Sequence, residues 1–198
     1  MADKLMTPVF RASYANLLKP KQRKDAKPDD APKYSVLIVL SKKLNTTKVF
    51  LAKLEKAMLA ASLEKHGKPI PKNKLKHWPI RDGDEENEDG DVDPNLAGCW
   101  CINASTKRKP QVVDKKGELL TSEDEVYSGA WFMATVRPWA WDNVTGGKGV
   151  SIELNNLLKD RDDDSLAGGT SKATDDFADH ISDDGEDSTE DADDDLMG

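Results

Sequence analysis

The sequence is short of the residues from which most catalytic centres are built. Its 198 residues include only two cysteines and three histidines. His66, His77 and His180 are far apart in the chain, at the end of a predicted helix, in a basic arm and in an acidic tail. The GGKG segment at residues 146–149 lacks the spacing of a phosphate-binding loop, and no nucleophile elbow is present. We therefore expect a protein without enzymatic activity.

The cysteines and the acidic residues do not have the spacing of a metal site. Cys99 and Cys101 offer two ligands without a second pair, whereas structural zinc needs about four. On a strand their side chains share a face, which favours small core residues in a reducing compartment over a disulfide. The acidic run Asp82–Asp93 contains the start of a calcium-loop pattern at Asp89, but Pro94 stands where that loop needs glycine. The sequence predicts a solvated acidic loop, no metal and no cofactor.

Long hydrophobic runs are also missing. No apolar stretch approaches the roughly 18 residues that suggest a membrane span. Residues 1–18 are polar and include Asp3, Lys4 and Arg11, so no signal peptide is predicted. We expect a soluble, intracellular protein.

Charge is abundant but segregated along the chain. The formal net charge is −8, an average that argues against a nucleic-acid partner. Residues 160–198 carry 16 acidic and 2 basic groups, a net charge of −14, while residues 1–159 carry 27 basic and 21 acidic groups, a net charge of +6. Eight of those 21 acids lie in residues 82–93. A basic body joined to an acidic tail is typical of polyanion binding with an interaction tail.

The periodicity of the body predicts short strands and one helix. Residues 47–66 have apolar residues at helical spacing, with Asn45, Thr46 or Thr47 as the cap and Gly67 at the end. The run 34–40 is apolar throughout, as for a strand buried on both faces. Residues 112–120 resemble a hairpin, and residues 155–159 are expected to form a helical turn. Further strands are predicted at residues 9–17, 98–104, 130–137 (ended by Pro138) and 149–154.

This pattern predicts a mainly β fold, a β-barrel of the OB-fold Greek-key type with one inserted α-helix and a disordered acidic C-terminal tail. We expect the folded domain to span residues 1–159, with the acidic loop 82–93 inserted, and the tail to span residues 160–198. A sandwich or another α+β arrangement stays open on periodicity alone.

Binding of single strands needs cations for phosphates and flat rings for bases, and the body supplies both. We expect phosphate contacts from Arg11, Lys19, Lys21, Lys107, Arg108 and Arg137. We expect base stacking on Tyr14, Trp78, Trp100, Trp139 and Trp141. Trp78, between prolines and lysines, is expected outside the core, whereas Trp131 is expected inside it. If the chain is extended after Pro138, Trp139 and Trp141 share one face.

Seven segments in order also carry a family resemblance. They are FRASYANLLKP (10–20), YSVL (34–37), IRDGD (80–84), INAS (102–105), KPQVVD (109–114), VYSG (126–129) and GVSIELNN (149–156). Together they resemble a family of bacteriophage single-stranded DNA-binding proteins, once catalogued as a domain of unknown function, over residues 5–160. The resemblance implies an OB-fold that binds single strands without strong sequence preference. The acidic loop after Arg81 is longer than the family pattern, and the tail ends DDDLMG without a terminal aromatic residue.

We therefore expect a protein that coats and protects single-stranded DNA during phage replication and recombination in the host bacterial cytoplasm. The acidic tail is expected to compete with DNA and to recruit a polymerase, helicase or nuclease. Two alternatives stay open. One is an acidic chaperone or scaffold that binds basic partners, and the other is a metal-dependent nuclease using Asp82, Asp84 and Glu86.

Overall fold

The computed structural model describes residues 4–22, 30–68, 70, 72–86, 90–143 and 147–166. The chain divides into two units, residues 1–167 and 168–198, and every described residue lies in the first. The predicted acidic tail beyond residue 166 lies outside the described residues. In chain order the elements are β1 (Leu5–Met6), β2 (Phe10–Lys21), β3 (Lys33–Ser41), α1 (Asn45–His66), the 3₁₀ helix η1 (Lys72–Lys74), β4 (Ile80–Asp82), β5 (Cys99–Thr106), β6 (Val112–Val113), β7 (Trp131–Asn143) and β8 (Gly147–Arg161).

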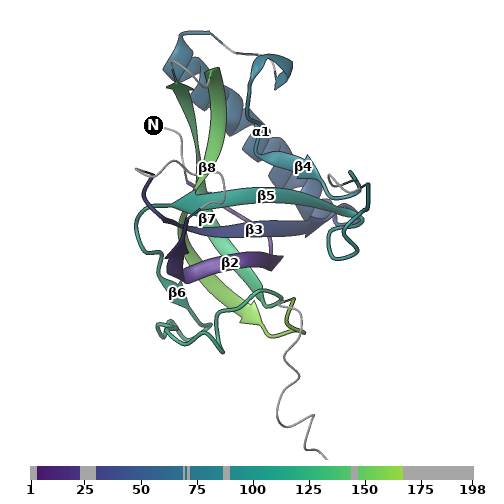
Figure 1. Ribbon diagram of the computed structural model, residues 1–198, viewed down its shortest axis with the longest axis vertical. Helices are drawn as coiled ribbons and strands as arrows, with labels where there is room; N and C mark the ends of the chain where they lie inside the picture. The colour runs from purple at the N-terminus through teal and green to yellow at the C-terminus, as the bar shows by residue number, and fades with distance from the viewer. Residues whose placement is uncertain are drawn as a thin grey trace, which may run out of the picture. The chain divides into compact units, whose positions relative to one another are not determined.

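Five of the strands pair into a closed ring. β2 pairs with β3 and β7, β3 pairs with β5, and β7 pairs with β8, all antiparallel. A parallel pairing of β5 with β8 closes the ring. β1, β4 and β6 add to its edges, and α1 lies between β3 and β4 in the chain (Figure 1). The predicted mainly β, OB-fold-like Greek-key architecture with one inserted helix is confirmed.

The apolar run of β3 is buried on both of its faces, as predicted. Val36, Ile38 and Leu40 point into the main core, which fills the ring. Leu37 and Val39 alternate with them and form a second, smaller cluster with Cys101 on the outer face of the sheet. Leu96, from the segment between β4 and β5, packs on this outer cluster. One strand therefore serves two apolar layers.

Helix α1 has the predicted C-terminal end but not the predicted cap at its start. Gly67 adopts a left-handed conformation (φ 69°), and its N–H donates to the carbonyl of Leu63 at 2.8 Å. At the other end the cap residue is Leu44, with no capping side-chain hydrogen bond, so the expected Asn or Thr cap is wrong. The helix is held instead by a buried stripe that includes Phe50, Leu54 and Met58, and among the strands it contacts mainly β7.

Strands β7 and β8 are longer than the sequence predicts. β7 continues through Pro138 to Asn143, because at Pro138 its paired neighbour is β8 alone and a missing N–H is tolerated there. β8 runs unbroken from Gly147 to Arg161, so the predicted helical turn at residues 155–159 is wrong. Leu157 and Leu158 pair with β6 on one side and with β7 on the other, which keeps this segment extended. No helix among the described residues is both long and apolar enough to cross a membrane.

Candidate nucleic-acid interface

The outer face of β2, β3 and β5 carries a row of polar side chains. Asn16 lies opposite Ser35, Ser35 opposite Ser105, and Ser105 beside Glu153 of β8. Glu153 in turn lies opposite Arg137 of β7. Because each of these residues is paired with one on the neighbouring strand, the five side chains form a continuous band across five strands. The second and third strands of an OB-fold, here β3 and β5, form its usual oligonucleotide-binding face.

Tyr14 is the most exposed ring on this side of the molecule. It has a φ of 47°, the one positive value among the described non-glycine residues, and the β2–β3 register shifts between Ser13 and Asn16 around it. This irregularity turns the side chain outward, with 67% of its surface exposed. The N–H of Ala15 is held by Ser128 Oγ at 2.9 Å. An exposed ring held in an unfavourable conformation is typical of a functional site.

Basic side chains gather where β2 ends and β3 begins. Lys21 and Lys33 lie directly opposite each other across the ladder, and both are exposed. Lys107 and Arg108 follow Thr106, whose partner on β3 is Tyr34, so they extend the same end of the sheet. Lys19 is exposed and pairs with Glu123 at 2.6 Å. Facing lysines repel each other, and a phosphate between them removes that repulsion.

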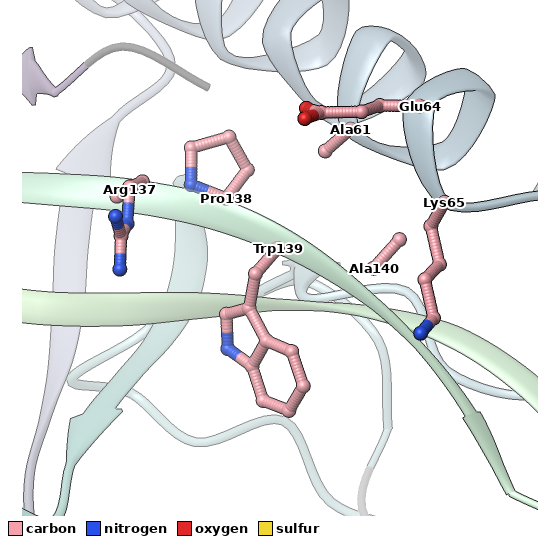
Figure 2. Close-up of a pocket in the computed structure, with 7 residues that line it drawn as sticks. All are labelled: Ala61, Glu64, Lys65, Arg137, Pro138, Trp139 and Ala140. Atoms are coloured by element: carbon pink, nitrogen blue, oxygen red, sulfur yellow. The ribbon is translucent and has the colours of Figure 1, made fainter. Parts of the chain in front are cut away.

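The predicted pairing of Trp139 with Trp141 on one face is confirmed, because β7 stays extended there. Trp139 is 46% exposed, whereas the Trp141 ring lies against Gly149 and donates its Nε1–H to Ser151 Oγ at 2.9 Å. Arg137 shares this face and binds Glu153 through Nε at 2.9 Å. Figure 2 shows Trp139 and Arg137 on the side of β7 away from α1, beside a cavity of about 440 Å³ between that helix and strand.

Two of the predicted stacking residues are half-buried against the main core. Trp78 packs on it from the segment before β4, so the expectation that this ring stands outside the core is wrong. Trp100 packs on the core from β5, and Lys42 Nζ lies 4.9 Å from its ring centroid. Trp100 is flanked by Cys99 and Cys101, and it points away from the outer face that Cys101 occupies.

Arg11 contacts the segment that follows β8, the first part of the acidic region. Its guanidinium donates to the carbonyl of Asp164 at 3.0 Å and lies 3.9 Å from the Asp163 carboxylate. Asp163 also accepts the Trp131 Nε1–H at 2.7 Å, which holds its pKa below the usual range. We name residues 162–166 the strap. Trp131, expected in the core, is half-buried and binds the strap through its indole N–H instead.

The acidic run is attached to the sheet at its start. Lys42 Nζ binds the carboxylates of Asp82 and Asp84, and Asp84 accepts the Gly98 N–H at 2.6 Å. These contacts lower the pKa of both carboxyls and raise that of Lys42, so all three stay charged at neutral pH. A side chain at Gly83 would overlap the carbonyl of Leu96, so the two arms of the segment touch. Residues 87–89 lie outside the described part of the chain.

The two cysteines are not set up as nucleophiles or ligands. Burial raises the pKa of Cys101 to about 11 and also raises that of Cys99, so both stay protonated thiols. Both are free, as expected of small core residues. Across the described ranges, no three His, Cys, Asp or Glu side chains are grouped so as to hold a metal ion.

Sequence patterns alone did not single out Arg81 or Lys33. Arg81 is exposed on β4 and lies opposite Cys101, which brings it to the hollow beside Tyr14. Lys33 was one lysine among many until the β2–β3 register placed it against Lys21. Strand pairing carries this information, and the neighbours of these residues in the sequence do not.

A protein-family model matches the chain over residues 3–193, and it is described as the single-stranded DNA-binding protein of Enterobacter phage Enc34. A solved structure of a single-stranded DNA-binding protein from bacteriophage Enc34, in complex with single-stranded DNA, has a TM-score of 0.68 and 26% identity to the chain. The match covers 83% of this chain and 89% of that one.

Two further relatives are more distant or more partial. The single-stranded DNA-binding protein gp2.5 of bacteriophage T7 has a TM-score of 0.54 at 16% identity, covering 94% of this chain and 99% of that one, a likeness of fold alone. A putative protein p50 of Acyrthosiphon pisum secondary endosymbiont phage 1 is 38% identical over 101 residues. That match spans 50% of this chain and 51% of the relative.

Proposed function

Because the chain belongs to the Enterobacter phage Enc34 family of single-stranded DNA-binding proteins, we propose that it binds single-stranded DNA without sequence preference. It coats and protects the strand during phage replication and recombination in the host bacterial cytoplasm. The observation that carries the proposal is the exposed Tyr14 beside the facing pair Lys21 and Lys33, on the OB-fold face of a chain whose structural relative was solved with single-stranded DNA. Members of such families bind DNA rather than transform it, so no catalytic residue is assigned.

The proposed path follows the polar band across the sheet. Phosphates lie on Lys19, Lys21, Lys107 and Arg108 at one end and on Arg137 at the other. Bases stack on Tyr14, and then on Trp139 and Trp141. Arg11 joins the phosphate contacts when it leaves the strap, whereas Trp78 and Trp100 support the sheet from the core. Stacking and phosphate contacts tolerate every base, which is why we propose binding without sequence preference.

Titration of tryptophan fluorescence with oligo-dT tests the proposal directly. We expect binding to single strands to be much tighter than binding to duplex of the same length. The logarithm of the association constant should fall linearly with the logarithm of salt concentration, by about 0.7 for each phosphate neutralised. Binding that is insensitive to salt, or a preference for duplex, would reject the proposal and favour an acidic scaffold for basic partners.

We further propose that the acidic tail competes with DNA and is then available to a polymerase, helicase or nuclease. The support is electrostatic, since residues 167–198 carry 12 acidic groups and 1 basic group. The strap ends beside Tyr14, because Leu166 lines the same hollow as Tyr14 and Lys21.

Truncation after Leu166 is expected to tighten binding of oligo-dT about tenfold at low ionic strength, with the gain shrinking as salt screens the competition. This end point keeps the whole of β8 and the strap, whereas a cut at Lys159 would remove the strap and the last two residues of β8. The matched control is a tail of equal length in which Asp and Glu are replaced by Asn and Gln, and it should behave like the truncation. Equal affinities of the full chain and the truncated chain at low salt would contradict tail competition.

A further inference from the structure

Tyr14 separates two hollows that differ in charge on the outer face. One, of about 300 Å³, is lined by Asn16 and Ser128 and by one charge of each sign, Lys21 and Asp93. The other, of about 270 Å³, is lined by the carboxylates of Asp82, Glu85 and Glu86 together with Arg81. Tyr14 lines both hollows, and so does Asp93. A strand that stacks on this ring therefore has a charge-balanced hollow with Lys21 on one side and a hollow of net negative charge on the other.

The segment that carries the acidic residues of the second hollow is fixed to the sheet. Leu96 packs on Leu37, Val39 and Cys101, which joins the return arm of the segment to the outer face of the sheet. The Gly83 N–H donates to the carbonyl of Cys99 at 2.9 Å, and the Lys42 N–H donates to that of Gly98 at 2.9 Å. These bonds hold Glu85 and Glu86, which follow Asp84 directly, at the edge of the hollow.

The packing of Leu96 also makes part of the outer face of the sheet inaccessible to DNA. In an OB-fold the bases lie over the second and third strands, and here Leu96 covers the part of β3 and β5 that includes Val39 and Cys101. A strand that continued past Tyr14 in this direction would meet both the covering segment and its carboxylates. Phosphates approaching fixed carboxylates are repelled, and the repulsion is strongest at low salt.

We propose that the described parts of the acidic segment, residues 82–86 and 90–93, end the DNA path at Tyr14. They confine the single strand to the basic side of the face, and so determine where the strand lies and how many nucleotides one protein covers. This inference rests on the proposed function, because it concerns the course of DNA across the same face. The carboxylates act by repulsion and make no contact with the bound strand.

The test is the double variant Glu85→Gln/Glu86→Gln, which removes two charges and keeps side-chain shape. Glu55→Gln/Glu118→Gln is the matched control, because it makes the same change in net charge at exposed positions on α1 and in the turn after β6. At low salt the first variant is expected to bind oligo-dT about five- to tenfold more tightly than the unaltered protein, and the control less than twofold. The shortest oligo-dT that reaches full affinity should also become longer in the first variant.

The other outcomes overturn the inference. Equal gains in both variants would mean that only net charge matters, and an unchanged oligonucleotide length would mean that the strand does not end at Tyr14. Weaker binding by the first variant would mean that the glutamates accept hydrogen bonds from bases. Failure of the unaltered protein to bind any oligo-dT would reject the proposed function itself, a result distinct from all three. Matching thermal midpoints would show that both variants fold.

Discussion

Reversing the charge of Lys21 and Lys33 is expected to weaken binding of oligo-dT about a hundredfold at low salt. The two lysines are paired across the β2–β3 ladder, at the basic end of the outer face. Lys21→Glu/Lys33→Glu replaces a pair that attracts a phosphate with a pair that repels it. Loss of two phosphate contacts should also reduce the slope of log K against log salt concentration by about 1.4. Fluorescence titrations at four or more salt concentrations measure both quantities.

The matched control for charge reversal is Lys53→Glu/Lys56→Glu. These lysines are exposed on α1 and lie outside the strands of the proposed path. The control changes the net charge by the same amount, so it should reproduce only the general electrostatic loss, a few-fold at low salt. If the two variants lose affinity equally, the Lys21–Lys33 pair has no special place on the DNA path. Their thermal midpoints should match, since all four side chains are exposed.

Tyr14→Ala is expected to cost about 1–3 kcal/mol of binding free energy, roughly a 5- to 150-fold loss of affinity. The ring is exposed in the structure and stands between the two hollows, so its removal takes away the stacking platform at the bend of β2. The positive φ is retained, because alanine is subject to the same backbone restriction as tyrosine. The loss should therefore appear in affinity and in the fluorescence change, with little effect on unfolding.

Tyr14→Phe keeps the ring and removes the hydroxyl, and it should bind within about twofold of the unaltered protein. Tyr14→Gly separates the two roles of the residue, because it removes the ring and relieves the left-handed backbone. It should bind as poorly as the alanine variant while unfolding at a higher temperature. Normal affinity in both ringless variants would remove Tyr14 from the interface.

Most of the strands of the closed ring could be predicted from the sequence, because each has a recognisable pattern of apolar and polar residues. Residues 34–40 are apolar on both faces, and the structure uses both. The errors arise where tertiary pairing overrides local preference. Proline usually ends a strand, but Pro138 is tolerated because β7 has one paired neighbour at that position. Residues 155–159 stay extended because β6 and β7 flank them. The start of α1 has no side-chain cap, because burial of its apolar stripe is sufficient.

The site was less predictable than the fold, because each ring was judged by its neighbours in sequence. Trp78 has prolines and lysines beside it in the sequence. It nevertheless packs against the core, because β4 follows it directly and is paired into the sheet. The period of a strand alone predicts that Trp139 and Trp141 share one face, and the structure confirms it. The contact of Arg11 with Asp163 and Asp164 joins residues more than 150 positions apart, which no local pattern can reveal.

Ring closure by β8 has a consequence for how the protein folds during synthesis. β5, β6 and β7 all pair with β8, the last strand of the described chain. The ladder with β5 therefore needs residues up to 153, that with β6 residues up to 158, and that with β7 residues up to 161 to have left the ribosome. Until then β5 and β7 present open edges, which are templates for pairing with other nascent chains. The many contacts between distant residues also predict folding on the slow scale of β-rich domains. Chains that stop before β8 should therefore accumulate as aggregates rather than as shorter binding modules.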